Sequence, residues 1–226
     1  MTTVIPRSIP AVRVDVTSPR DIDAFCHLLS LATPGEPLPP AVAEAPRLKI
    51  GPPLSHGRVL CLSARNNTSQ PIGALIASTP RWIFEHSRLT GTPLPFILQH
   101  RVISIHAVAV HPDHRHRGIA RKLIRSAERR ARDAGYLVTL LEHPAKLTDF
   151  YTRLGYHAGS DQHVVSMPQR LLLAQDSTGL CAAAKPLTNQ TNVTVVPGFP
   201  SGIICGLLPG TNMPSTVRYR NGQLTY

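Results

Sequence analysis

Alternation of apolar and polar residues predicts short strands in the first third of the chain. Residues 12–16 (Val-Arg-Val-Asp-Val) alternate as a half-buried strand does. Ser18-Pro19 then places a capping serine before a proline, and the apolar spacing that follows predicts a helix to about Leu31. Residues 59–63 and 72–78 are apolar runs separated by a polar turn, so they predict an antiparallel hairpin.

The middle of the chain has the strongest pattern. Residues 102–110 form the longest apolar run and predict a strand that ends before Pro112. From Ile119 onward apolar residues recur at helical spacing, with arginine and lysine between them, and Gly135 predicts the end of that helix. Residues 137–141 read as a buried strand.

A second helical stripe follows at residues 147–154 and ends at Gly155. Residues 156–158 and 163–167 then predict two closing strands. The alternation of strands and helices favours an α/β or α+β fold with helices packed on a sheet. After residue 173 the pattern decays into Gly-, Pro- and Thr-rich sequence, so we expect a domain over residues 1–173 and a disordered or loosely packed tail over residues 174–226.

Composition limits the partners more than it limits the fold. The formal net charge is +11, from 24 basic and 13 acidic residues, which favours anionic partners such as a phosphorylated small molecule or nucleic acid. The four cysteines show no metal-ligand spacing, and we expect reduced thiols and no metal. No apolar run is long enough for a membrane span, and residues 1–10 do not resemble a signal peptide, so we expect a cytoplasmic protein.

The turn before the basic helix carries the most informative chemistry. Arg115-x-x-Gly118-x-Ala120 stands between a predicted strand and a predicted helix. The first amides of a helix have no partner inside it and carry partial positive charge, so they bind anions. Gly118 would let the backbone approach a phosphate without a side chain in the way. Arginines around the same point add charge, and the turn predicts a pyrophosphate cradle.

Two motifs in this order resemble the GNAT superfamily of N-acetyltransferases. The first is Val108-Ala109-Val110-His111-Pro112 leading into Arg115-x-x-Gly118-x-Ala120, and the second is Phe150-Tyr151-Thr152-Arg153-Leu154-Gly155-Tyr156. The resemblance covers roughly residues 12–171. It implies a mixed, mostly antiparallel sheet of six to seven strands, with helices on both faces and a splay at the acetyl-CoA site. It also implies the cofactor-binding residues Val108, Ala109, Val110, Arg115, His116, Arg117, Gly118, Ile119, Ala120, Arg121 and Tyr151.

Acetyl transfer requires a neutral amine, so a base or a water chain must accept a proton. His106 is our candidate base because its pKa range suits neutral pH, and Ser104 shares its strand face and could hold a relay water. Glu142 is the alternative base. By the resemblance, a backbone N–H near Val108 stabilises the oxyanion, and Tyr151 protonates the leaving thiolate.

The long strand and the Phe-Tyr motif look most like the arylalkylamine N-acetyltransferase branch. That branch carries two histidines two residues apart, where this chain has Ser104 and His106. Many family members also have an asparagine six residues before the motif's phenylalanine, where this chain has Pro144. This departure puts side-chain help for the cofactor at that point in doubt.

The acceptor is expected to be an amine, with an arylalkylamine or a polyamine as candidates and protein N-termini, lysines and aminoglycosides also left open. Its pocket would be walled by residues 33–57 and 81–101, where Trp82, Phe84 and Phe96 offer apolar surface and Glu36, Glu44 and Glu85 offer charge. One alternative is a GNAT-fold protein that binds acyl-CoA without turnover. A basic nucleic-acid-binding protein is disfavoured, since the chain lacks a recognition motif and is poor in aromatic residues. A homodimer stays open.

Overall fold

The computed structural model describes residues 12–32, 44, 54, 58–160, 162–168, 170–174 and 179–225. Seven strands form one sheet in the order β1-β2-β3-β4-β5-β9-β6. These strands are β1 (Arg13–Val16), β2 (Leu60–Arg65), β3 (Pro71–Ser78), β4 (Val102–Val110), β5 (Val138–His143), β9 (Cys181–Pro186) and β6 (His157–Ser160). The sheet is mostly antiparallel, and β4 pairs with β5 in parallel. The predicted fold class is therefore confirmed.

The chain divides into two units, each described by itself. Unit 1 comprises residues 1–76 and 107–127, and unit 2 comprises residues 77–106 and 128–226. The boundaries fall inside β3, β4 and the basic helix α5 (Ile119–Asp133). The predicted strand over residues 102–110 and the helix that follows it are both confirmed.

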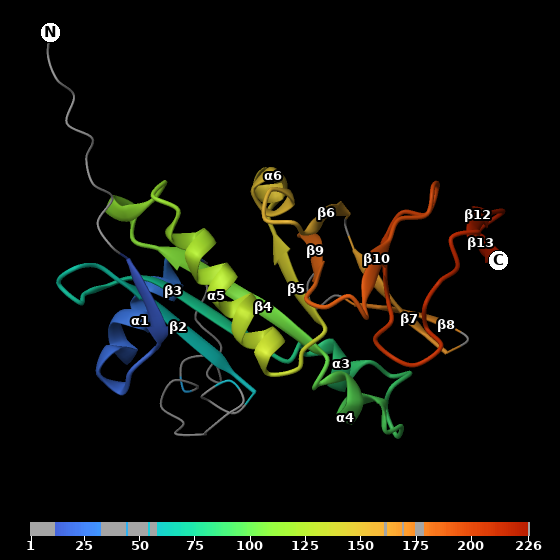
Figure 1. Ribbon diagram of the computed structural model, residues 1–226, viewed down its shortest axis with the longest axis horizontal. Helices are drawn as coiled ribbons and strands as arrows, with labels where there is room; N and C mark the ends of the chain where they lie inside the picture. Colours follow the sequence, from blue (N-terminus) through green and yellow to red (C-terminus); the bar gives the residue numbers. More distant parts are fainter. Residues whose placement is uncertain are drawn as a thin grey trace, which may run out of the picture. The chain divides into compact units, whose positions relative to one another are not determined.

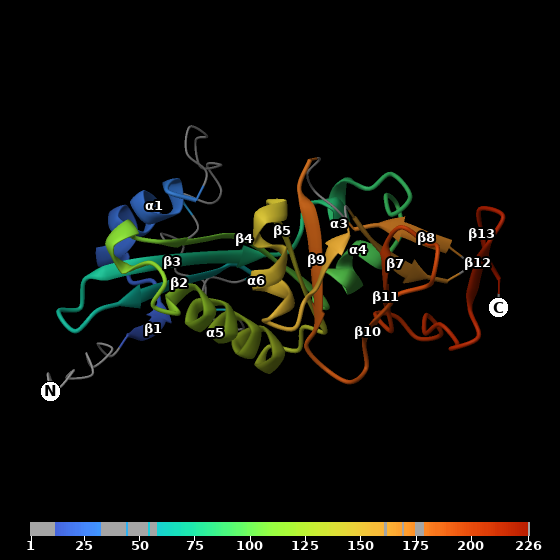
Figure 2. The same cartoon turned by 90° about the horizontal axis from the view of Figure 1, so that it is seen from above.

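Unit 1 is a sheet segment with a helix on each face. The 3-10 turn Pro19–Asp21 leads into α1 (Ile22–Ser30), whose buried Phe25 packs with Ala74 and Ile76 of β3. A Cβ added at Gly73 would lie 3.1 Å from side-chain atoms of Ile119 and Leu123, so the opposite face of β3 receives α5. Figure 2 shows α1 and α5 on the two sides of β2 and β3. The helix start was predicted correctly, but Ser18 bonds the side chain of Asp21 instead of capping the backbone.

Unit 2 contains the rest of the main sheet and a smaller one. Short helices α3 (Trp82–Glu85), α4 (Leu94–Leu98) and α6 (Thr148–Thr152) precede or connect its strands. The second sheet has the order β10-β11-β7-β8, and a separate hairpin pairs β12 with β13. The strands are β7 (His163–Met167), β8 (Arg170–Leu173), β10 (Asn192–Thr194), β11 (Gly202–Cys205), β12 (Arg218–Arg220) and β13 (Gln223–Thr225).

Two expectations about the end of the chain are wrong. Residues 174–226 are not simply a loose tail, because β9 pairs with β5 on one side and β6 on the other, inside the main sheet (Figure 1). Residues 163–167 do form a strand, but β7 pairs with β8 and β11 in the second sheet. β9, from the segment expected to be a tail, therefore supplies a strand of the main sheet that the sequence did not predict. The segment 33–57, expected to form one wall of the acceptor pocket, lies outside the described residues apart from Glu44 and Leu54.

Candidate active site

β4 carries several of the predicted site residues, some in its unit 2 part and some in its unit 1 part. Its register with β5 runs from Val102 opposite Val138 to Ile105 opposite Leu141. His106 is the first β4 residue beyond that register, and β5 continues beside β9 to His143. The parallel pairing of β4 with β5 therefore ends one residue before the predicted base, at the place where the resemblance implies that the two strands splay.

The turn after β4 has an unusual backbone in unit 1. His111 hydrogen bonds β3 through its backbone N–H, and the 3-10 turn Pro112–His114 follows. His116 has φ of 60° and Gly118 has φ of 74°, so two residues near the helix start adopt left-handed conformations. Such alternation turns successive N–H groups toward one concave side, which is how backbone nests bind anions. A Cβ at Gly118 would meet no atom within 4 Å, so the space beside it is open.

At the start of α5 the backbone amides and the side chains serve different purposes. The N–H of Lys122 is bonded to the Gly118 carbonyl at 3.1 Å, which places the amides of Ile119, Ala120 and Arg121 in the first turn. The Ile119 side chain is 2% exposed and packs toward Gly73. Only the backbone of Ile119 is thus suited to the cofactor role that the sequence assigned to it.

The arginines of this turn differ in their contacts. Arg115, Arg117 and Arg121 are all exposed. The Nε–H of Arg115 donates to the Val110 carbonyl at 3.1 Å, which fastens the turn to the end of β4. Val108 and Val110 are partly buried, and Ala109 is buried at 5% exposure. The predicted cofactor residues from Val108 to Arg121 therefore gather around one turn of unit 1.

His106 and Ser104 lie in the unit 2 part of β4. His106 is exposed, and its Nε2 lies 2.7 Å from the hydroxyl of Ser78 at the end of β3. This bond orients the imidazole. The sequence analysis missed Ser78, although its position at the end of the preceding strand was a usable signal. Ser104 is only 7% exposed and lines a small cavity together with Glu142.

Tyr151 is held among aromatic rings of unit 2. Its ring centroid lies 4.9 Å from that of His143, 5.1 Å from Phe150 and 5.8 Å from Tyr156. The side chain is 7% exposed, and burial raises its pKa to about 12. The phenol is therefore protonated at neutral pH, as a proton donor must be. His143, which the sequence analysis did not single out, donates from Nδ1 to the Pro144 carbonyl at 2.9 Å.

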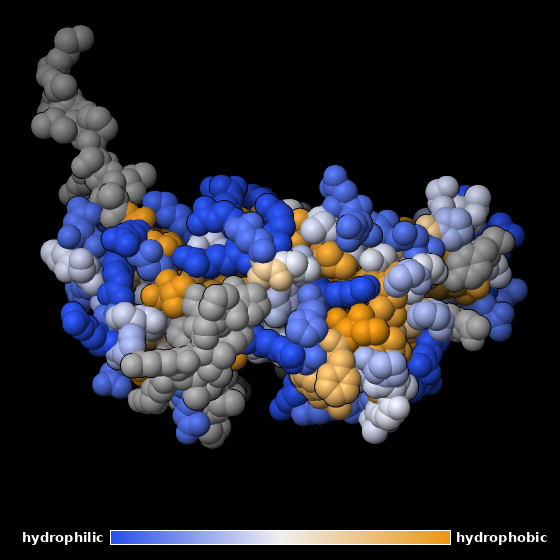
Figure 3. All heavy atoms as spheres, turned by 60° about the horizontal axis from the view of Figure 1, so that its bottom comes forward, coloured by the Kyte–Doolittle hydropathy of each residue, from blue (hydrophilic) through white to orange (hydrophobic). Residues whose placement is uncertain are grey.

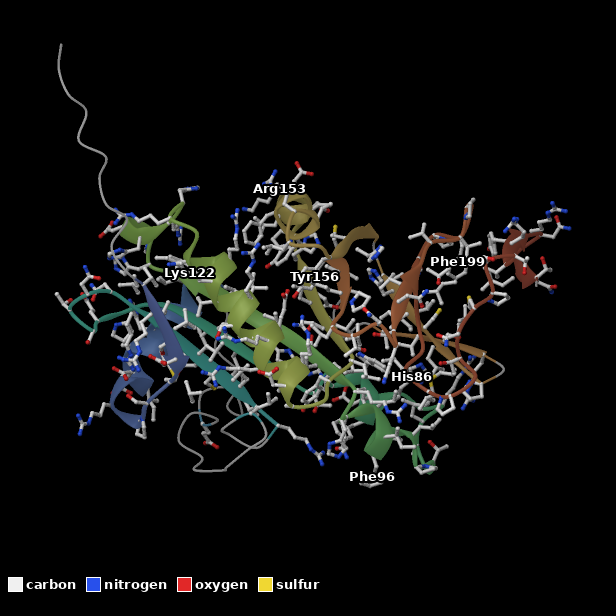
Figure 4. The ribbon with its side chains drawn as sticks, in the orientation of Figure 1. His86, Phe96, Lys122, Arg153, Tyr156 and Phe199 are labelled. Carbon is white, nitrogen blue, oxygen red and sulfur yellow. The ribbon has the colours of Figure 1, made fainter. Side chains whose placement is uncertain are left out.

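A partly buried cation fixes the end of the closing motif. Lys185 of β9 donates from Nζ to Glu128 and to the Leu154 carbonyl, both at 2.7 Å. The same Nζ lies 5.4 Å from the ring centroid of Tyr156, which is labelled in Figure 4. Burial and Glu128 raise the Tyr156 pKa well above its ordinary value. Lys185 could not be found from the sequence, because it lies in the segment expected to be a tail.

The three aromatic residues proposed as an acceptor wall do not lie together on the surface. Trp82 is 5% exposed and belongs to the core of unit 2. Phe84 of α3 and Phe96 of α4 are 51% and 71% exposed. Figure 4 shows Phe96 projecting away from α4, and Figure 3 shows apolar atoms exposed in the region of α3 and α4.

Within the described ranges, no three His, Cys, Asp or Glu side chains are grouped closely enough to hold a metal ion. None of the helices in the described part of the chain combines the length and the apolar character that crossing a membrane requires.

Solved structures with the same architecture include several acetyltransferases. A GNAT family N-acetyltransferase from Escherichia coli, in complex with CoA, has a TM-score of 0.51 and 16% identity, over 90% of this chain and 92% of that one. A GNAT family acetyltransferase from Staphylococcus aureus has a TM-score of 0.52 and 10% identity, over 79% and 100%. Ard1 from Thermoplasma volcanium has a TM-score of 0.51 and 12% identity, over 79% and 99%. At these identities the likeness shows the fold alone.

The sequence gives the family directly. No curated protein matches the chain significantly. The family model described as Acetyltransferase (GNAT) family matches residues 23–156, which is more than half of the chain. This span includes the β4 strand, the turn at Gly118 and the Tyr151 motif. The chain therefore belongs to the GNAT family of acetyltransferases.

Proposed function

We propose that this protein transfers an acetyl group from acetyl-CoA to a primary amine, by direct attack in a ternary complex. The observation that carries the proposal is the end of the β4–β5 pairing at Ile105, directly before His106. A strand that loses its neighbour there leaves backbone groups of β4 available to a pantetheine arm.

The turn at Gly118 fits the diphosphate of acetyl-CoA. The two left-handed residues, His116 and Gly118, and the first-turn amides of α5 supply hydrogen-bond donors, and the open space beside Gly118 admits an anion. Exposed Arg117 and Arg121 add positive charge nearby in the chain. Support also comes from the Escherichia coli structure, which has this fold and contains CoA.

The reaction requires two proton transfers, one to a base and one from an acid, and a different residue carries out each. The amine nitrogen attacks the thioester carbonyl carbon, and the C–S bond breaks as the amide forms. His106 accepts the proton that the amine loses, and Ser78 holds its ring in place. Tyr151 donates its phenolic proton to the departing thiolate, which its pKa of about 12 keeps available at neutral pH. The backbone N–H near Val108 is the proposed oxyanion donor.

Among acceptors, we favour arylalkylamines over polyamines. Phe84 and Phe96, which precede β4 in the chain, each expose a large apolar ring, and such a ring suits contact with an aromatic amine. Glu85, a candidate for binding a polyamine, is already in an ion pair with Arg81 at 3.2 Å. The basic surface of α5 also repels polycations.

The test is release of the CoA thiol with arylalkylamines, polyamines and short peptides, alongside calorimetric titration of acetyl-CoA. Turnover with an arylalkylamine that fails in His106→Ala, with acetyl-CoA affinity retained, supports the proposal. Tight acetyl-CoA binding without turnover on any amine would instead identify a non-catalytic acyl-CoA-binding protein. Absence of acetyl-CoA binding would refute both.

A further inference from the structure

A small cavity in unit 2 lies against the β4–β5–β9 part of the sheet. Its polar lining residues are Ser104, Glu142 and His163, and the rest is mostly apolar, including Leu140 and Ala182. The free volume is about 10 Å³, close to what a single water molecule requires. The cavity is therefore too small for a substrate but suitable for one bound water.

His163 brings two unsatisfied ring nitrogens to this cavity. The residue is 1% exposed, and neither Nδ1 nor Nε2 has a hydrogen-bond partner among the described residues. Burial, aided by the charge of nearby His157 and partly opposed by the His157 backbone, lowers its pKa to about 4. The ring is thus neutral at pH 7, with one donor and one acceptor. Burying such a group without partners is unfavourable, so we expect the cavity to hold a polar partner for the ring.

The absence of a side chain at Gly202 leaves room for the His163 imidazole. Gly202 of β11 stands opposite His163 of β7 in the parallel register. A Cβ at Gly202 would lie 2.8 Å from both Cδ2 and Nε2 of the ring, a separation that carbon atoms do not tolerate. The ring therefore occupies a defined place over glycine instead of swinging freely.

The cavity also borders the proposed proton path. Ser104 lines it, and on a β-strand Ser104 and His106 point to the same face, about 7 Å apart along β4. A water bonded to the Ser104 hydroxyl would fix the direction of that hydroxyl. Through Ser104 it would act on the groups around His106 without touching the substrate.

We propose that this cavity holds one water molecule, bonded to Ser104 and His163, and that His163 is a positioning residue for acetyl transfer. The water site itself stands on the geometry of the cavity. The catalytic consequence rests on the proposed N-acetyltransferase function.

The first experiment is a crystal structure of the full chain at a resolution that shows ordered water. One water within hydrogen-bond distance of Ser104 Oγ and of a His163 ring nitrogen is expected. An empty cavity, or a protein group bonded to both ring nitrogens, would overturn the proposal. This result does not depend on turnover, so it is decided even if no amine is acetylated.

The second experiment compares His163→Leu, His163→Gln and Ser104→Ala in the CoA-release assay. We expect His163→Leu to lower kcat about tenfold, less than the loss of a general acid or base would, while the KM for acetyl-CoA changes less than about twofold. Glutamine keeps a donor and an acceptor, so it should recover most of kcat. If His163→Leu does not fold, Ser104→Ala removes only a hydroxyl and tests the same water.

A double-substitution cycle separates a shared water from two independent defects. If Ser104 and His163 hold one water, Ser104→Ala/His163→Leu should be no slower than the slower single variant. Multiplicative losses, or a glutamine variant as slow as the leucine variant, would contradict the shared site. Equal losses of secondary structure in all variants would assign His163 a merely structural role.

Discussion

The hydroxyl of Ser78 lies 2.7 Å from Nε2 of His106, so β3 supplies a partner for the proposed base on β4. Ser78→Ala removes that partner but leaves the imidazole. We expect kcat to fall about threefold to tenfold, whereas His106→Ala should cost about 100-fold or more, as for loss of a general base. Ser78→Thr keeps the hydroxyl and is the matched control. Measured with saturating acetyl-CoA, equal rates for His106→Ala and the unmodified protein would exclude His106 as the base.

Tyr151→Phe tests the proposed acid without changing the shape of the ring. The variant should lower kcat about tenfold to 100-fold and leave acetyl-CoA affinity nearly unchanged, since it removes one proton donor. Calorimetric titration and steady-state kinetics on the same preparation separate these two effects. Phe150→Leu, at the neighbouring ring, is a control for disturbed packing. A comparable kcat loss in that variant would point to the aromatic cluster instead of the hydroxyl.

The raised Tyr151 pKa also predicts alkaline instability. A phenol whose pKa is about 12 when folded and about 10 when unfolded stays protonated in the folded state while the unfolded chain ionises. The contribution to stability is complete below pH 10 and is lost as the pH rises toward 12, by up to about 3 kcal/mol. Urea unfolding at pH 8 and pH 10.5 should show a smaller alkaline loss in Tyr151→Phe. An identical loss would assign the effect to Tyr156.

His163 predicts the opposite behaviour in acid. Its pKa is about 4 in the folded state and about 6.5 unfolded, so the unfolded chain binds a proton first. Stability from this residue is present above pH 6.5 and falls as the pH drops toward 4, by about 3 kcal/mol in total. His163→Gln should flatten unfolding free energies between pH 7 and pH 5. His157→Gln, at an exposed neighbour, provides the comparison.

Gly118→Ala separates backbone strain from cofactor binding. Gly118 and Gly91 have φ of 74° and 75°, and a Cβ at either would meet nothing within 4 Å. Alanine should therefore cost each site a similar 1–2 kcal/mol of folding stability, roughly the penalty for a left-handed residue. Only Gly118→Ala should weaken acetyl-CoA binding, by about tenfold, if a Cβ there obstructs the diphosphate. Equal affinities for the two variants in calorimetry would remove Gly118 from the cofactor site.

Sequence patterns predicted the elements that have strong apolar periodicity. Residues 102–110 and the helix beginning at Ile119 were found at their true positions because a buried strand and an amphipathic helix both leave regular spacing. The GNAT assignment followed from the turn between them. The arylalkylamine branch was a finer expectation, and it stays a proposal about the acceptor.

The errors share a physical cause. The β9 segment, Cys181-Ala-Ala-Ala-Lys-Pro, contains no β-branched or aromatic residue, so its strand character comes from pairing with β5 and β6 and not from local preference. Because β9 was not predicted as a strand, the role of Lys185 within it was not predicted either. Ile119 was assigned to the cofactor by motif position, and because its side chain packs toward Gly73 of β3, that assignment stays a prediction about its backbone N–H. Ser78 and His163 escaped attention because their importance depends on neighbours from distant strands.

The position of β9 has a consequence for biosynthesis. Tyr151 leaves the ribosome roughly 30 residues before β9 does and β6 roughly 20 residues before it, and the second-sheet strands β7 and β8 emerge in between. During that interval β5 and β6 have open edges, which are templates for pairing with other chains. A nascent or prematurely terminated polypeptide ending near residue 174 would carry both sequence motifs of the family and yet lack the strand that joins β5 to β6. Expression of the intact C-terminal segment is therefore a condition for obtaining dispersed protein.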